Sequence, residues 1–184
     1  MSDVTFVSTN PGKFREVREL LAPFGVSTRW DRRTLPEPQA DTLEEVVAAK
    51  LAAVHGQRGY VLVEDSGLFV PSLGGFPGVY SAHFLKIWKF DPLLELLRRR
   101  DRRAFFRTVA GLRRGSKHWT FVGEVPGRIA ARPKGENGFG YDPIFIPEGY
   151  RRTFGELPLE TKNALSHRAQ AVRQVGEFLR SRHR

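Results

Sequence analysis

The chain has no cysteine and a single methionine among its 184 residues. The absence of cysteine excludes disulfide bonds, thiolate metal sites and a cysteine nucleophile. The longest stretch without Asp, Glu, Lys or Arg, residues 66–85, is too rich in glycine and proline to predict a membrane helix. The first residues read directly as a strand, with no basic and then apolar leader. We therefore expect a cytoplasmic protein that does not associate with membranes.

Acidic residues are scarce relative to basic ones. The chain has 30 Lys and Arg against 20 Asp and Glu, a formal net charge of +10. Such an excess favours polyanionic partners, meaning nucleic acid or phosphorylated small molecules. The arginine cluster at 98–103 is more simply interpreted as a solvated basic face, with a nucleic-acid contact as the alternative.

Strand-like and helix-like segments alternate along the chain and predict an α/β fold with a sheet of mixed direction. The length allows one well-buried domain, or two lobes that share a cleft. We expect strands near 4–8, 26–30, 60–63 and 144–146, a hairpin of 104–111 and 117–125, and helices at 11–24, 42–55 and 166–180, with a further helix starting at Asp91.

Two adjacent carboxylates, Glu64 and Asp65, follow the apolar run that starts at Tyr60. Because side chains alternate along a strand, the two acids can share a site only if the backbone turns there, and Gly67 is placed to permit a turn. Open α/β sheets bind ligands at the carboxyl ends of their strands, and carboxylates suit a hard cation such as Mg²⁺. The alternative interpretation is a solvated acidic turn between two strands.

The turn after the first strand combines a helix-capping residue with a cation. Asn10 is placed as an N-cap and Pro11 as the first helical residue, while Gly12 permits close approach and Lys13 adds charge. This predicts an anion site at a helix N-terminus, although the sequence is not a Walker A loop. A helix that is merely capped is the alternative. The helical spacing places Glu16 on the outer face.

Two other segments carry polar residues with both a structural and a functional interpretation. Thr42 and Glu45 have the spacing of a capping box, which gives Glu45 a structural role. The glycine-rich segment 135–145 could let the backbone approach a ligand or form a tight turn into a strand. His167 and Arg168 would lie in the first turn of the last helix, where the dipole disfavours cations unless an anion or ligand compensates.

Five segments together resemble the inosine triphosphate pyrophosphatase family. They are 8–13, 64–68, 74–82, 138–145 and 166–169, in the order of that family. The resemblance implies hydrolysis of non-standard purine nucleoside triphosphates (ITP, dITP and XTP) to the monophosphate and pyrophosphate with Mg²⁺, which cleanses the nucleotide pool. It also implies a long twisted mixed sheet with flanking helices in two lobes around a central cleft, one catalytic domain over residues 1–184, and a homodimer.

The same resemblance implies the roles of single residues. Asp65 would be the catalytic base and a metal ligand together with Glu45, with Glu64 as a further candidate. In many relatives, Asn and Ala follow the metal-binding glutamate, whereas here Val46 and Val47 follow Glu45. The choice of Glu45 over its neighbour Glu44 therefore rests on the distance along the sequence to Lys50. The substrate-binding residues would be Ser8, Thr9, Asn10, Lys13, Ser66, Phe139, Gly140, Tyr141, Asp142, Lys162, His167 and Arg168.

Arg168 is the candidate for base discrimination, because a guanidinium offers only donors and would leave the amine of adenine unpaired. The main alternative function is that of a basic nucleic-acid-binding module without catalysis. Only the net charge supports this alternative. It would also require aromatic and basic residues interleaved on an exposed sheet, which this chain lacks, so nucleic acid is not expected as a partner. A second alternative is a phosphohydrolase of the same chemistry whose substrate is another modified nucleotide.

Overall fold

The computed structural model describes residues 2–182, and this part of the chain falls into two compact units. Among these residues, unit 1 contains 2–65, 108–123 and 167–182, and unit 2 contains Ser66–Arg107 and Glu124–Ser166. No helix within residues 2–182 is both long and apolar enough to cross a membrane. The predicted arrangement of two lobes around a cleft stays a prediction.

Residues 2–182 form a seven-stranded sheet in the order β2-β1-β3-β5-β6-β7, with β4 pairing with β3. β1 runs parallel to β2 and β3, whereas β4 is antiparallel to β3 and β7 is antiparallel to β6. The predicted α/β fold with a long mixed sheet is therefore confirmed. The strands are β1 (Ser2–Val7), β2 (Val26–Asp31), β3 (Tyr60–Phe69), β4 (Pro77–Gly78), β5 (Arg103–Arg114), β6 (Lys117–Ile129) and β7 (Phe145–Pro147).

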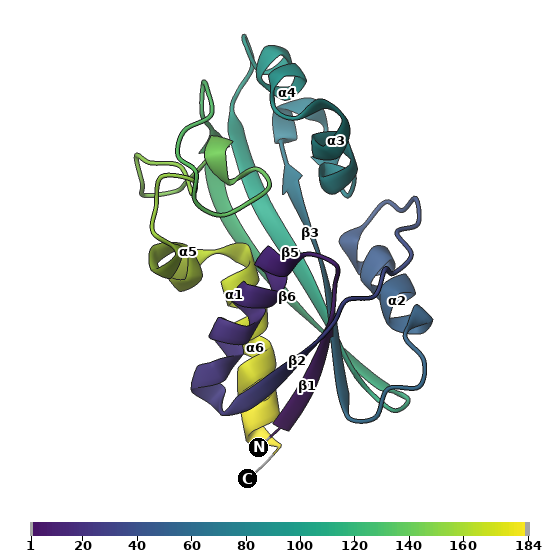
Figure 1. Cartoon of the computed structure of the whole chain (residues 1–184). Coiled ribbons are helices and arrows are strands. Elements are labelled where there is room, and N and C mark those ends of the chain that lie inside the picture. Colours follow the sequence, from purple (N-terminus) through teal and green to yellow (C-terminus); the bar gives the residue numbers. More distant parts are fainter. Residues whose placement is uncertain (1, 183–184) are drawn as a thin grey trace. The chain divides into compact units, whose positions relative to one another are not determined.

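In unit 1, helices α1 (Pro11–Leu21) and α6 (His167–Ser181) lie side by side (Figure 1). Their apolar faces pack on β1 and on the residues of β3 that point the same way, including Tyr60 and Leu62. Asn10 caps α1 and Pro11 is its first residue, as predicted. A short 3-10 helix, η1 (Ala22–Phe24), follows α1. The core contains Val4, Phe6, Val17, Leu20, Leu21, Val26, Ala110, Leu112, Ala169, Ala171, Val172, Val175 and Leu179.

Helix α2 (Leu43–Ala53) begins with the predicted capping box of Thr42 and Glu45. It lies directly on β5, because a Cβ added to Gly111 would meet the side chain of Val47 at 2.5 Å and that of Leu51 at 2.8 Å. The glycine thus lets the helix approach the strand closely.

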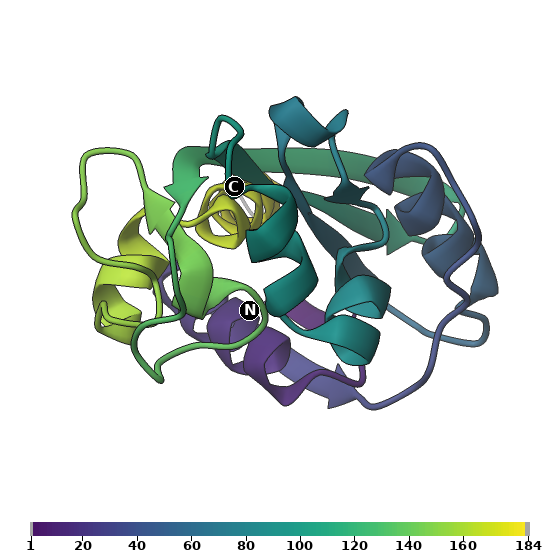
Figure 2. The ribbon, with the colours of Figure 1, turned by 90° about the horizontal axis from the view of Figure 1, so that it is seen from above.

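Unit 2 has a second core around Leu68, Phe106, Phe145 and Phe154. Its helices α3 (Ser81–Trp88) and α5 (Leu159–Leu165) fall outside the predicted segments. They have only 8 and 7 residues, which is shorter than the window over which an apolar period can be recognised in a sequence. The unit also contains α4 (Asp91–Leu96) and the 3-10 helices η2 (Pro71–Leu73) and η3 (Asp142–Ile144); Figure 2 shows α5 beside the preceding loops.

The predicted turn at Gly67 is wrong, because β3 continues without interruption to Phe69. Gly67 serves another purpose. A Cβ at this position would lie 2.4 Å from the carbonyl oxygen of Gly78, and β4 pairs with β3 here through Leu68 and Gly78. The missing side chain makes room for the neighbouring backbone.

We expect Gly67→Ala to lower the free energy of unfolding by about 1–3 kcal/mol, because the methyl group would push two backbones apart. Urea unfolding measures this. Gly74→Ala is the control, since Gly74 has a positive φ of 66° but no atom within 4 Å of an added Cβ. The control isolates backbone strain of about 1 kcal/mol. A Gly67→Ala effect no larger than that of the control would contradict the steric explanation.

Candidate functional site

Two predicted segments of unit 1 meet at the carboxyl edge of the parallel strands. β1 ends at Val7 and leads through residues 8–10 into α1. β3 pairs with β1 as far as Leu62, so Glu64 and Asp65 lie just beyond the paired region in the same direction. This is the edge at which open α/β sheets place their ligands.

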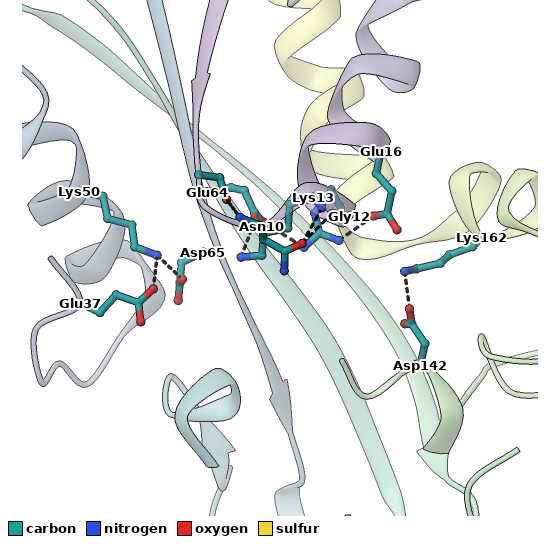
Figure 3. A network of polar contacts seen from close by, with 12 residues as sticks. Asn10, Gly12, Lys13, Glu16, Glu37, Lys50, Glu64, Asp65, Asp142 and Lys162 are labelled. Atoms are coloured by element: carbon teal, nitrogen blue, oxygen red, sulfur yellow. Dashed lines mark hydrogen bonds and ion pairs between the residues drawn. The ribbon is translucent and has the colours of Figure 1, made fainter. Parts of the chain in front are cut away.

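Glu64 belongs to a buried network of two acids and two cations (Figure 3). Its Oε1 lies 2.5 Å from Nζ of Lys13, and its Oε2 lies 3.3 Å from Nη2 of Arg168. Nη1 of Arg168 lies 2.7 Å from Oε2 of Glu16. The side chains of Glu16, Glu64 and Arg168 are at most 2% exposed, so each charge depends on its partners.

The prediction that Glu16 faces solvent is wrong, since only 2% of the residue is exposed. Helical spacing places a charged residue on the outer face by default. The partner that changes this, Arg168, lies 152 residues away in the sequence. Local periodicity carries no signal for such a pair.

Asp65 forms a second group with Lys50 and Glu37, which Figure 3 shows apart from the first. Nζ of Lys50 lies 2.6 Å from Oδ1 of Asp65 and 3.2 Å from Oε1 of Glu37. Burial raises the pKa of Asp65 above its ordinary value, and the charges of Lys13 and Lys50 only partly oppose this. For Lys50, burial opposes the charged form, but the carboxylates of Asp65 and Glu37 outweigh it and raise the pKa.

The two adjacent acids therefore have different partners. Because β3 does not turn, Glu64 and Asp65 point to opposite faces of the strand. Glu64 pairs with Lys13 and Arg168, whereas Asp65 pairs with Lys50. Within residues 2–182, no group of three or more His, Asp or Glu side chains is arranged to hold a metal ion.

Glu45 lies on the surface at the start of α2, where its structural role is confirmed. Its Oε2 accepts hydrogen bonds from the backbone N–H groups of Asp41 at 3.0 Å and Thr42 at 3.3 Å. Its metal-binding role stays a prediction. Glu37, which sequence reasoning missed, is a second carboxylate that contacts Lys50, besides Asp65. In the sequence, the only feature that distinguishes Glu37 is its position between two prolines, Pro36 and Pro38.

The segment 8–13 is ordered by its own side chains. Oδ1 of Asn10 accepts hydrogen bonds from the N–H groups of Gly12 at 2.8 Å and Lys13 at 3.1 Å. The backbone N–H of Asn10 in turn donates to Oγ of Ser8 at 3.1 Å. The Thr9 side chain is exposed. The segment thus forms a capped helix start in which the N–H groups of Gly12 and Lys13 are bonded to Asn10, and its anion-binding role stays a prediction.

A third charged group lies within unit 2. Nζ of Lys162 is 2.6 Å from Oδ2 of Asp142, and both side chains are at most 3% exposed. The same carboxylate oxygen accepts a hydrogen bond from the backbone N–H of Phe139 at 2.7 Å. Lys162 also lies 4.6 Å from the centre of the Phe139 ring. The pair therefore fixes the turn that carries the half-buried Phe139 and the exposed Gly140.

Tyr141 is buried, and its hydroxyl donates to the carbonyl oxygen of Ser81 at 2.8 Å. Burial raises its pKa well above the ordinary value. The hydroxyl therefore holds unit 2 together, and the predicted substrate contact of Tyr141 stays a prediction. Of the other predicted residues, Ser66 is half-buried in β3 and His167 is buried at the start of α6.

A mixed sheet whose parallel strands end at buried pairs of acids and cations defines an α/β protein suited to charged small molecules. The profile of the Ham1 family matches residues 4–178. The chain belongs to the Ham1 family, and the resemblance stated from its motifs is confirmed.

Curated relatives and solved structures agree with this assignment. The chain is 46% identical over 180 residues to the dITP/XTP pyrophosphatase of Thermococcus kodakarensis, covering 96% of this chain and 97% of that protein. The Pyrococcus horikoshii dITP/XTP pyrophosphatase is 43% identical, with 96% of each covered. A HAM1 protein from Coxiella burnetii superimposes with a TM-score of 0.85 at 31% identity, covering 98% of this chain and all (100%) of that one.

We expect Glu16→Gln to lower the free energy of unfolding by about 3 kcal/mol, because it leaves the buried Arg168 with less compensating charge. Urea unfolding measures the loss. Glu95→Gln is the matched control, since Glu95 pairs with Arg98 at 3.3 Å on the surface. Such an exposed pair contributes about 0–1 kcal/mol. Equal effects of the two substitutions would refute the importance of the buried pair.

Proposed function

We propose that this chain hydrolyses non-standard purine nucleoside triphosphates, namely ITP, dITP and XTP, to the monophosphate and pyrophosphate. The relatives from Thermococcus kodakarensis and Pyrococcus horikoshii, named dITP/XTP pyrophosphatases, align with almost the whole chain. The observation that carries the proposal is Asp65, a buried carboxylate with a raised pKa at the carboxyl edge of the parallel strands. It is paired with one lysine and lies in the field of another.

Magnesium is the metal that fits the available oxygen donors. Asp65 and Glu37 both place a carboxylate oxygen within 3.2 Å of the Lys50 ammonium group, so this spot already accommodates positive charge. Mg²⁺ is commonly held by one or two carboxylates, with water and substrate phosphates completing its shell. Asp65 and Glu37 would hold it here, with Glu45 as the ligand that the family resemblance implies. When bound, Mg²⁺ neutralises charge on the phosphate oxygens.

Asp65 would act as the general base. A carboxylate within hydrogen-bond reach of a water molecule can take a proton from it as the water attacks. The water oxygen would form a bond to the α-phosphorus while the bond to the bridging oxygen of the β-phosphate breaks, and pyrophosphate leaves. Lys13, whose side chain is 18% exposed, would bind the phosphates.

The base and sugar would be bound by Phe139, Lys162, His167 and Arg168, together with Ser66, Gly140, Tyr141 and Asp142. Arg168 offers only donors and would bind the oxo group of hypoxanthine while leaving the amine of adenine unpaired. Glu16 and Glu64 fix its guanidinium and would thereby fix the direction of its N–H groups. We also propose a cytoplasmic homodimer that does not bind nucleic acid.

The test of the reaction is Asp65→Asn, assayed with ITP and Mg²⁺ and with pyrophosphate and orthophosphate measured separately. We expect wild-type protein to release pyrophosphate and the variant to lose at least about 100-fold in rate, the lower range for a lost general base. Asp101→Asn, at a surface aspartate paired with Arg103, is the control and should keep full activity. Undiminished release by folded Asp65→Asn, checked by circular dichroism, would rule out the assignment.

The metal ligand is tested by comparing Glu37→Gln with Glu45→Gln. We expect Glu37→Gln to raise about tenfold the Mg²⁺ concentration needed for half-maximal activity, as for a weakened metal site. Glu45→Gln should leave both that concentration and the free energy of unfolding almost unchanged, because glutamine also serves at this position of a capping box. The reverse pattern would assign the metal to Glu45.

A further inference from the structure

One residue outside the predicted site, Trp30, is bonded to the segment that would bind the phosphates. Trp30 lies near the carboxyl end of β2, and its indole Nε1–H donates to the carbonyl oxygen of Ser8 at 2.7 Å. The backbone N–H of Ser8 donates to the carbonyl oxygen of Asp31 at 3.1 Å. Strand β2 therefore forms hydrogen bonds with both the N–H and the carbonyl oxygen of Ser8, the first residue of segment 8–13.

Trp30 also contacts the residue that follows the segment. Its ring stacks on that of Phe14, with the ring centres 4.6 Å apart and an angle of 9° between the planes. The guanidinium of Arg32 lies 4.4 Å from the centre of the Trp30 ring. One side chain thus fixes Ser8 by a hydrogen bond and Phe14 by stacking, on either side of the residues between them.

The hydrogen bonds within the segment pass this constraint on to Lys13. Ser8 accepts from the N–H of Asn10 through its Oγ, and Asn10 accepts from the N–H groups of Gly12 and Lys13 through its Oδ1. The backbone of Lys13 is thereby fixed relative to Ser8. A shift of Ser8 would displace the lysine that is proposed to bind phosphate.

The contacts require tryptophan in particular. The indole combines an N–H donor with a large flat face, whereas phenylalanine supplies only the face. Phenylalanine at this position should keep most of the stacking on Phe14 and lose only the hydrogen bond to Ser8. The two contacts can therefore be separated by substitution.

We propose that Trp30 is a positioning residue for the triphosphate group, which holds segment 8–13 in the conformation that binds phosphate. This rests on the proposed function. Trp30 acts through Ser8 and Lys13 and touches no reacting atom, so it should affect substrate affinity and not the chemical step. Because phosphates are common to all substrates, the effect should not depend on the base.

The experiment compares Trp30→Phe with the wild type. We expect KM for ITP to rise about fivefold, the value of one ordinary hydrogen bond, with kcat within about twofold. KM for XTP should rise by the same factor. The dissociation constant of pyrophosphate, measured by calorimetry, should also rise about fivefold, which reports binding without turnover.

Trp119→Phe is the matched control. Trp119 is half-buried in the same unit and packs on Phe178 with ring centres 4.8 Å apart, away from segment 8–13. This variant makes the same chemical change and should leave KM, kcat and pyrophosphate affinity unchanged. If Trp30→Phe does not fold, Phe14→Leu tests the stacking contact from the other side, and KM should again rise.

Three results would overturn the inference: an unchanged KM in folded Trp30→Phe, a loss confined to kcat, or an equal rise of KM in Trp119→Phe. Calorimetry distinguishes failure of the inference about Trp30 from failure of the proposed function. If the wild type binds pyrophosphate but does not hydrolyse ITP, the proposed function fails, and the pyrophosphate affinity of Trp30→Phe still decides the role of Trp30. If the wild type does not bind pyrophosphate at all, the inference itself fails.

Discussion

Strand β3 carries two neighbouring carboxylates that point to opposite faces, and each one meets a lysine from a different helix. Lys13 of α1 contacts Glu64, and Lys50 of α2 contacts Asp65. Removing one member of such a pair would leave a buried charge without compensation, which is costly in a medium of low dielectric constant. The strand therefore requires both helices to be present and in register.

Buried ion pairs are an inefficient way to stabilise a fold, because the desolvation of two charges offsets most of their attraction. Unit 1 nevertheless buries Glu16, Glu64 and Arg168 almost completely. It also buries Asp65 of β3 and Lys50 of α2. An apolar core of the same volume would fold as well. The retention of these charges agrees with a function that needs fixed cations and a carboxylate of raised pKa, as phosphate chemistry does.

The residues that the family resemblance implies are found in each of the two units. Lys13 and Asp65, for which phosphate and metal binding are proposed, belong to unit 1, whereas Phe139, Asp142 and Lys162 belong to unit 2. Within each unit, an acid fixes the backbone or the cation that would meet the ligand. Asp142 holds the N–H of Phe139, and Glu64 holds Lys13. If these groups bind the ligand as proposed, they are oriented before any substrate arrives, which would lower the entropy cost of binding.

The sequence alone determined the α/β class, the long helices and their caps, because apolar period and capping residues are local signals. Asn10, Thr42 and the buried apolar residues of α1, α2 and α6 follow from spacing within about four positions. Only the tertiary structure decided what depends on distant partners. It buried Glu16 against Arg168, brought Glu37 to Lys50, and used Gly67 to admit β4 in place of a turn. Each of these follows from a contact between residues remote in sequence, which no local pattern records.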